Sequence, residues 1–149
     1  MVWSENLISI ILSVVLGAAV GLEREIKGKP AGLRTNVLIC LGAAVFTIIS
    51  EKMAGDKDSI TRIAAQIVTG VGFLGAGAVI QDRGGIHGLT TAATIWMVAS
   101  IGMACGAGFF LLAVTSTIIA LIVLIGLTPL ERWVGPLRRK HQAKSASGE

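Results

Sequence analysis

The chain contains the stretch LTTAATIWMVASIGMACGAGFFLLAVTSTIIALIVLIGL at residues 89–127, which has no charged residue. The small residues at 106–108 divide it into two apolar segments, and three more precede it; the five segments are 7–22, 33–50, 63–80, 89–105 and 109–127. Each is close to the roughly 17–25 residues that cross a ~30 Å hydrocarbon core as a helix. Because that core offers no water to backbone polar groups, we expect every segment to be helical.

The composition also indicates a membrane protein. Hydrophobic residues make up 53% of the 149 residues and charged residues only 15%, and the mean hydropathy is +0.77. Soluble domains carry about 25% charged residues, so this composition excludes a disordered chain and an ordinary soluble enzyme. Two cysteines are too few for a disulfide-stapled secreted domain. The sequence therefore predicts an all-α, polytopic helical bundle in a membrane.

The distribution of basic residues predicts the number of crossings. With five crossings, ten of the 13 Lys and Arg residues lie on one side, whereas fusing the last two segments divides them five against eight. Lys and Arg gather in short cytoplasmic segments, so we predict five transmembrane helices, the N-terminus outside and the C-terminus cytoplasmic. Residues 1–128 form the transmembrane domain. Residues 129–149 form a basic cytoplasmic tail that suits anionic lipid better than nucleic acid.

Glycine is abundant, with 19 residues, and lies mostly within or beside the apolar segments. Small residues let membrane helices approach closely, and the sequence contains two GxxxG patterns and one dense glycine run. Close helix packing is one interpretation of the run at 70–77, and a kink or broken helix lining a cavity is the other. The predicted packing residues are Gly17, Gly21, Gly70, Gly72, Gly75, Gly77, Gly102 and Gly106.

Polar residues gather where the first and third links would meet the cytoplasmic face. Two interpretations stay open: a site for a cation or a partner, or charges that pair to fix the loop geometry. Two threonines here fall in the first turn of the fourth segment, where a hydroxyl can cap free N–H groups. An acid at the depth of Arg34 would favour pairing with it over lying bare. The candidate residues are Glu23, Arg24, Glu25, Gly32, Arg34, Thr35, Asn36, Asp82, Thr90 and Thr91.

A second polar group lies toward the outer side. Arg62, Gln66 and Thr69 share one helical face, which fits either a polar vestibule or a solvated loop with an arginine reaching the surface. Mg²⁺ prefers oxygen ligands, but the acidic residues here alternate with basic ones, so we assign no metal site. Whether the protein binds Mg²⁺ is left open. No catalytic constellation occurs, so we expect neither an enzyme nor a resident cofactor.

Several motifs together resemble the MgtC/SapB family of bacterial inner-membrane proteins. They follow the family's order over roughly residues 17–108, which makes the resemblance specific. They are GLERE at 21–25, PAGLRTN at 30–36, LGAAVF at 41–46, RIAAQ at 62–66, GVGFLGAG at 70–77, GLTTAAT at 88–94 with Trp96, and IGMACG at 101–106.

The resemblance implies a multi-pass helical domain in the inner membrane with its N-terminus outside. Family members are linked to growth in low Mg²⁺ and, in pathogens, to survival inside host cells. The implied role is regulation of other membrane machinery, with the F-type ATP synthase a named target. MgtC-type members also carry a C-terminal soluble domain, so we expect this chain to be the short, SapB-like form. Thr90 stands where some virulence-linked members have Asn.

Two function hypotheses follow from the residues and the resemblance. The first is a regulatory membrane protein that binds partner helices through its glycine faces and the inner polar group. The second is a passive pathway or transporter for Mg²⁺ or another cation. The sequence is also compatible with a homodimer, because short spans bury little surface and GxxxG faces can pair between chains.

Overall fold

Helices account for nearly all of the part of the chain that the structure, a computed structural model, describes. That part comprises residues 2–53, 57–82 and 85–127, with side chains described for 6–53, 61–80 and 85–127. The helices are α1 (Val2–Ile26), α2 (Leu33–Met53), α3 (Lys57–Gly77), α4 (Leu89–Gly106) and one further helix, Phe110–Leu127. The prediction of an all-α membrane bundle is confirmed.

The chain divides into two units, residues Met1–Thr117 and Ile118–Glu149. The first contains α1 to α4 and the beginning of the helix Phe110–Leu127. The second contains the rest of that helix, and its residues 128–149 are outside the described part. The predicted basic tail at 129–149 therefore lies outside the described residues.

Four described helices are long and apolar enough to cross a membrane: Asn6–Ile26, Leu33–Met53, Leu89–Gly106 and Phe110–Leu127. Helix α3 has the same length as α2, 21 residues, but a more polar composition, and is not among them. At about 1.5 Å per residue it is still about 31 Å long. The five-crossing topology and its orientation in the cell stay predictions.

Helix α3 also differs from its predicted bounds. It begins at Lys57, ahead of the predicted start at residue 63, and ends at Gly77 rather than residue 80. The glycine run at 70–77 forms an unbroken end of this helix.

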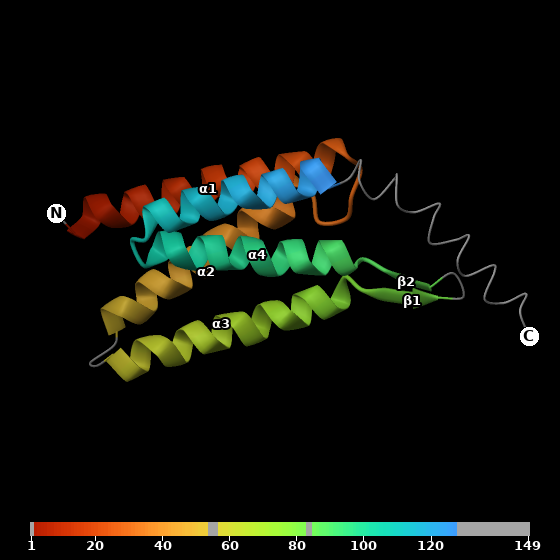
Figure 1. Ribbon diagram of the computed structural model, residues 1–149. Helices are drawn as coiled ribbons and strands as arrows, with labels where there is room; N and C mark the ends of the chain where they lie inside the picture. Colours follow the sequence, from red (N-terminus) through yellow and green to blue (C-terminus); the bar gives the residue numbers. More distant parts are fainter. Residues whose placement is uncertain (1, 54–56, 83–84, 128–149) are drawn as a thin grey trace, which may run out of the picture. The chain divides into compact units, whose positions relative to one another are not determined.

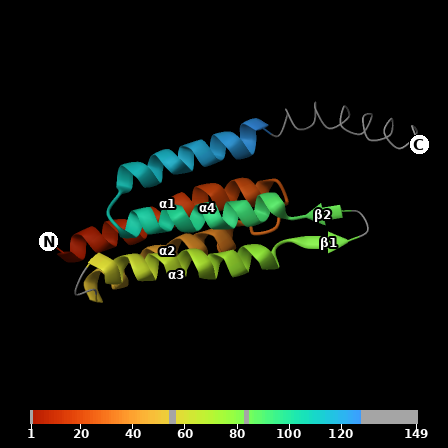
Figure 2. The same cartoon turned by 60° about the horizontal axis from the view of Figure 1, so that its bottom comes forward.

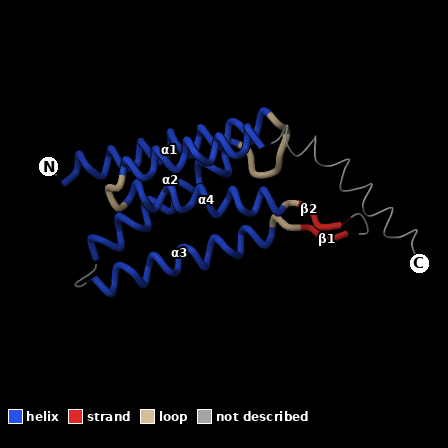
Figure 3. The backbone as a smooth tube through the Cα atoms, viewed as in Figure 1, coloured by secondary structure: helices blue, strands red, loops and turns tan. Residues whose placement is uncertain are grey.

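A β-hairpin, which the sequence did not predict, follows α3. Strand β1 (Ile80–Asp82) pairs antiparallel with β2 (Gly85–His87) (Figure 3). In this register Ile80 lies opposite His87. Gly88 then starts α4 with a φ of 90°, a left-handed conformation that glycine adopts without strain. A Cβ atom there would collide with the carbonyl of Ala78. Gly88 therefore brings the start of α4 against the end of α3.

In the first unit, α1 to α4 lie side by side in alternating directions (Figures 1 and 2). Helix α2 packs against α1, α3 and α4, and α4 also packs against α1 and α3. The link at residues 27–32 and the hairpin lie at one end of this unit, and the end of α2 and start of α3 lie at the other. The first and third links thus share an end, as the predicted topology requires.

Glycines make the closest contacts between α1, α2 and α4. A Cβ atom at Gly17 of α1 would lie 2.8 Å from Cβ of Cys40, and one at Gly102 of α4 would collide with the Cys40 carbonyl. Cys40 is fully buried between them. A Cβ atom at Gly21 would lie 2.8 Å from Cα of Leu33, and one at Gly106 would lie 2.7 Å from Cβ of Thr47. These four glycines therefore set the spacing of the three helices.

The glycines of α3 are placed differently. Gly75 makes an ordinary contact, 3.6 Å from a built Cβ atom to Ala92, whereas a Cβ atom at Gly70, Gly72 or Gly77 meets nothing within 4 Å. These three glycines are exposed, so they do not pack against another helix of the described chain.

We predict that Gly102→Leu prevents normal packing of α4 on α2, because the new side chain would overlap the backbone of Cys40. Overpacking of this kind costs about 1–3 kcal/mol or more. Thermal unfolding of the purified protein in detergent should show a Tm lowered by many degrees, or an aggregated protein. The matched control is Gly72→Leu, which faces open space. Equal Tm values for the two variants would contradict the assignment of Gly102 as a packing contact.

Candidate functional site

The candidate site lies at the end of the first unit that holds the link at residues 27–32. We call it the link cluster: Glu23, Arg24 and Glu25 at the end of α1, Asn36 on α2 and Thr91 on α4. The sequence predicted all five as site residues, and hydrogen bonds connect each of Arg24, Glu25 and Asn36 to a neighbouring segment.

Arg24 connects α1 to α4 across 67 positions of the sequence. Its side chain is 3% exposed, and Nη2 donates hydrogen bonds to Oγ1 of Thr91 at 2.5 Å and to the carbonyl of Pro30 at 3.2 Å. A buried charged group is costly unless it is hydrogen-bonded or paired. The contacts with Thr91 and Pro30 therefore fix the position of α4 relative to the link.

Asn36 holds the turn that precedes α2. Its side chain is completely buried, and Nδ2 donates to the carbonyls of Ala31 and of Gly32, the latter at 2.8 Å. Ala31 has a φ of 57°, a left-handed conformation that costs a non-glycine residue roughly 1–2 kcal/mol. Together with the Arg24 contact, three successive carbonyls of the link accept hydrogen bonds from two buried side chains.

Glu25 caps the N-terminus of α2. The backbone N–H of Leu33, the first residue of α2, donates to Oε2 of Glu25 at 2.9 Å. A carboxylate there satisfies a free N–H group and suits the positive end of the helix dipole. A Cβ atom at Gly32 would collide with this carboxylate oxygen. Gly32, another predicted residue, therefore leaves room for the cap.

The predicted capping role of the threonines in α4 was wrong. Among the described residues, no side chain caps this helix at Gly88. The hydroxyl of Thr91 accepts the hydrogen bond of Arg24 instead, and Thr90 is exposed, with its carbonyl accepting a bond from the Thr94 hydroxyl at 2.7 Å. The sequence did not indicate this contact, because the two partners are far apart along the chain.

The link cluster also contains buried polar atoms that have no hydrogen-bond partner in the described structure. Glu23 pairs with Lys27, one turn further along α1, at 2.7 Å between Oε1 and Nζ. The other carboxylate oxygen of Glu23, Nε of Arg24 and Oδ1 of Asn36 are buried without a hydrogen-bond partner in the described structure. The cluster thus keeps one donor and two acceptors unused.

Two other predicted residues at this end, Arg34 and Thr35, face outward. Arg34 and Thr35 are exposed on the first turn of α2, and Arg34 forms no ion pair with any residue whose side chain is described. Asp82 belongs to strand β1, but its side chain lies outside the described residues. Pairing of Arg34 with this acid therefore stays a prediction.

The outer polar residues lie on α3, and Arg62, Gln66 and Thr69 are all exposed. The hydroxyl of Thr69 donates to the carbonyl of Ala65 at 3.0 Å, within its own helix. No hydrogen bond or ion pair among the described side chains joins this group to the link cluster, so the two polar groups are separate features.

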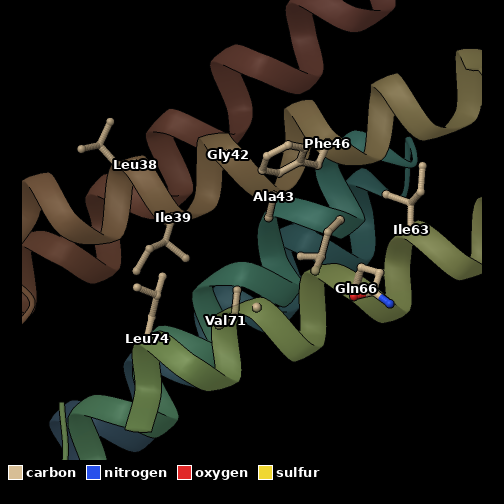
Figure 4. A pocket seen from close by; sticks show the side chains of 11 residues that line it. Leu38, Ile39, Gly42, Ala43, Phe46, Ile63, Gln66, Val71 and Leu74 are labelled. Carbon is tan, nitrogen blue, oxygen red and sulfur yellow. The ribbon is translucent and has the colours of Figure 1, made fainter. Parts of the chain in front are cut away.

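An apolar groove of about 610 Å³ lies between α2 and α3 (Figure 4). Its walls include Leu38, Gly42 and Phe46 of α2 and Gly70 and Leu74 of α3, and Gln66 is the one polar side chain that lines it. Sequence analysis missed this groove, although it had identified Gln66 and Gly70 separately. In the described residues, no group of three or more His, Cys, Asp and Glu side chains could hold a metal ion.

We predict that Thr91→Val, which removes the hydroxyl at nearly constant shape, lowers stability because the Arg24 guanidinium loses an acceptor. Hydrogen bonds to charged groups are worth about 1.5–3 kcal/mol, so the Tm of the purified protein should fall by several degrees. Thr90→Val, at the exposed neighbouring position, is the control and should leave the Tm within about one degree. A Thr91→Val protein as stable as the control would show that the contact contributes little.

Comparison with known proteins places these features in a family. The model of the MgtC family matches residues 10–133, and no solved structure matches the chain. The chain is 42% identical over 134 residues to an uncharacterized protein of Synechocystis, covering 90% of this chain and 57% of that protein. It is 45% identical over 128 residues to the putative magnesium transporter YhiD of Escherichia coli, covering 81% and 60%.

A third relative is the protein MgtC of Salmonella typhimurium, 48% identical over 115 residues, covering 77% of this chain and 49% of that protein. The chain thus spans about half to three fifths of the length of these relatives. The family match includes α2, α3, the hairpin, α4 and the helix Phe110–Leu127. This membrane protein therefore belongs to the MgtC family.

Proposed function

We propose that the chain acts in the bacterial inner membrane in Mg²⁺ homeostasis, by binding and regulating other membrane proteins rather than by conducting an ion. The observation that carries this proposal is the arrangement of hydroxyl groups within the helices. A conducting path needs polar groups that face a common channel.

Apart from Thr91, the helical hydroxyls whose hydrogen bonds the structure describes bond to their own helices instead. Ser13 donates to the carbonyl of Ile10 at 2.8 Å, Thr47 to that of Ala43 at 2.8 Å and Ser100 to that of Met97 at 2.7 Å. The close glycine contacts between α1, α2 and α4 leave little room between these helices. Both features favour a packed bundle that presents its surface to partners.

The link cluster supports the same proposal. Arg24, Glu25 and Asn36 are engaged in holding the link and the ends of α2 and α4. Such contacts give a fixed surface at this end, with Arg34 and Thr35 directed outward. The F-type ATP synthase, which the family resemblance names, is a candidate partner for that surface.

Transport of Mg²⁺ is the second candidate function. It is favoured by the name of a relative, the putative magnesium transporter YhiD of Escherichia coli. The unpartnered acceptors of Glu23 and Asn36 are the described groups that a cation could approach.

Reconstitution of the purified protein in liposomes separates the two functions. We predict that Mg²⁺ entry, followed by a Mg²⁺-sensitive dye inside, equals that of protein-free liposomes, while an ionophore gives a full signal. The same protein should restore growth in low Mg²⁺ to a bacterial strain that lacks its own family member. Mg²⁺ entry that scales with protein and is lost in Glu23→Gln would favour transport and overturn the proposal.

The exposed arginine of the link end provides a second prediction. Arg34→Gln should reduce growth in low Mg²⁺ without changing the Tm, because Arg34 is exposed and forms no described ion pair. Lys52→Gln, an exposed basic residue at the other end of α2, is the control and should leave growth unchanged. If strains that carry either variant grow like the strain with the unmodified protein, the end of the bundle at residues 27–32 is not a partner surface.

A further inference from the structure

The groove between α2 and α3 leaves an amide group in an apolar environment. Gln66 lies next to the middle of the 21-residue helix α3, and it has no hydrogen-bond partner in the described structure. In Figure 4 its amide end extends from α3 beside the groove. With α3 as the predicted third crossing of the membrane, this depth is far from water, and an unpaired amide there is costly.

The same face of α3 is free of other contacts. Four residues of α3 are spaced four, three and four positions apart, so they form one line along the helix: Gln66, Gly70, Phe73 and Gly77. Phe73 is 81% exposed, and built Cβ atoms at Gly70 and Gly77 meet nothing within 4 Å. Gly42, across the groove on α2, is equally open. We call these four α3 residues the α3 seam.

A second copy of the chain fits this seam better than lipid does. Two copies in one membrane share the same orientation, so a two-fold axis along the membrane normal brings identical residues together at the same depth. Each Gln66 would then face its equivalent. A carboxamide both donates and accepts, so the pair can form two reciprocal hydrogen bonds. An acyl chain offers neither donor nor acceptor.

The remaining seam residues suit the same arrangement. Gly70 and Gly77 allow two parallel helices to approach closely, and the groove gives room for the exposed Phe73 and Leu74 side chains. Arg62 lies one turn before Gln66, near the start of α3, where its long side chain can extend to water rather than oppose its equivalent.

We infer that the chain forms a symmetric dimer in the membrane, with α3 of each copy seated along the α2–α3 groove of the other and the two Gln66 amides bonded across the axis. This interface uses helix faces that the proposed regulatory function does not assign, and it is tested by oligomeric state alone.

The test measures the dimer fraction of the full chain in liposomes over a range of protein-to-lipid ratios, by single-molecule photobleaching of a fluorescent label. The unmodified protein should dimerise, Gln66→Leu should weaken dimerisation about tenfold, and Gly70→Leu should weaken it more. Interhelical hydrogen bonds in membranes are worth about 0.6 kcal/mol each on average, so two give an effect of this order.

Gly72→Leu is the matched control. Gly72 lies on the same helix and is equally open, but it points away from the α3 seam. Because neither Gly70 nor Gly72 has a neighbour within 4 Å, both variants should fold with an unchanged Tm. Only Gly70→Leu should lose the dimer.

Disulfide trapping gives an independent measurement. Phe73→Cys should cross-link to its equivalent in oxidised membranes, whereas Val15→Cys, at an exposed position of α1, should not. A monomer at all protein-to-lipid ratios, or a dimer that Gln66→Leu and Gly70→Leu leave intact, would overturn the inference. In the first case lipid or a different membrane protein covers the groove.

Discussion

The hydrogen bonds of the buried Arg24 guanidinium are the contacts on which the end of the bundle depends. They join the last turn of α1 to the first turn of α4 through Thr91 and to the link through Pro30. Asn36 adds bonds to the next two carbonyls of the link. The side chains of Arg24, Asn36 and Thr91 are buried, so displacing one of them leaves several polar atoms without partners. The carbonyls of the link are therefore held by side chains of α1 and α2.

Glycines hold the helices together along their length, whereas Arg24 holds them together at one end. Those of α1 and α4 bring two helices against Cys40 and Thr47 of α2, and they close the interior of the first unit. Most of those in α3 are directed outward and leave an open surface beside the groove. One residue type thus serves two purposes in this protein, because its effect depends on whether a helix lies opposite.

Hydropathy and charge were sufficient to predict the helices and the gathering of polar residues where the first and third links lie. These depend on local composition, so they can be recognised in a short stretch of sequence. The partner of Arg24 could not be predicted, because Thr91 follows 67 residues later and any hydroxyl near α4 would have looked equivalent. The hairpin was missed because Ile80 extends the apolar pattern of α3. Glycine spacing identifies a helix face, but it does not tell which helix that face meets.

The polar composition of α3, the predicted third crossing, has a consequence for how such a helix would enter the bilayer during synthesis. Gln66 near its middle and Arg62 near its start weaken the tendency of α3 to leave the translocon alone, because polar and charged side chains oppose insertion. Only residues 54–56 separate α2 from α3. The more apolar α2 is thus close enough for the pair to partition as one helical hairpin, so the biogenesis of α3 would rely on its predecessor.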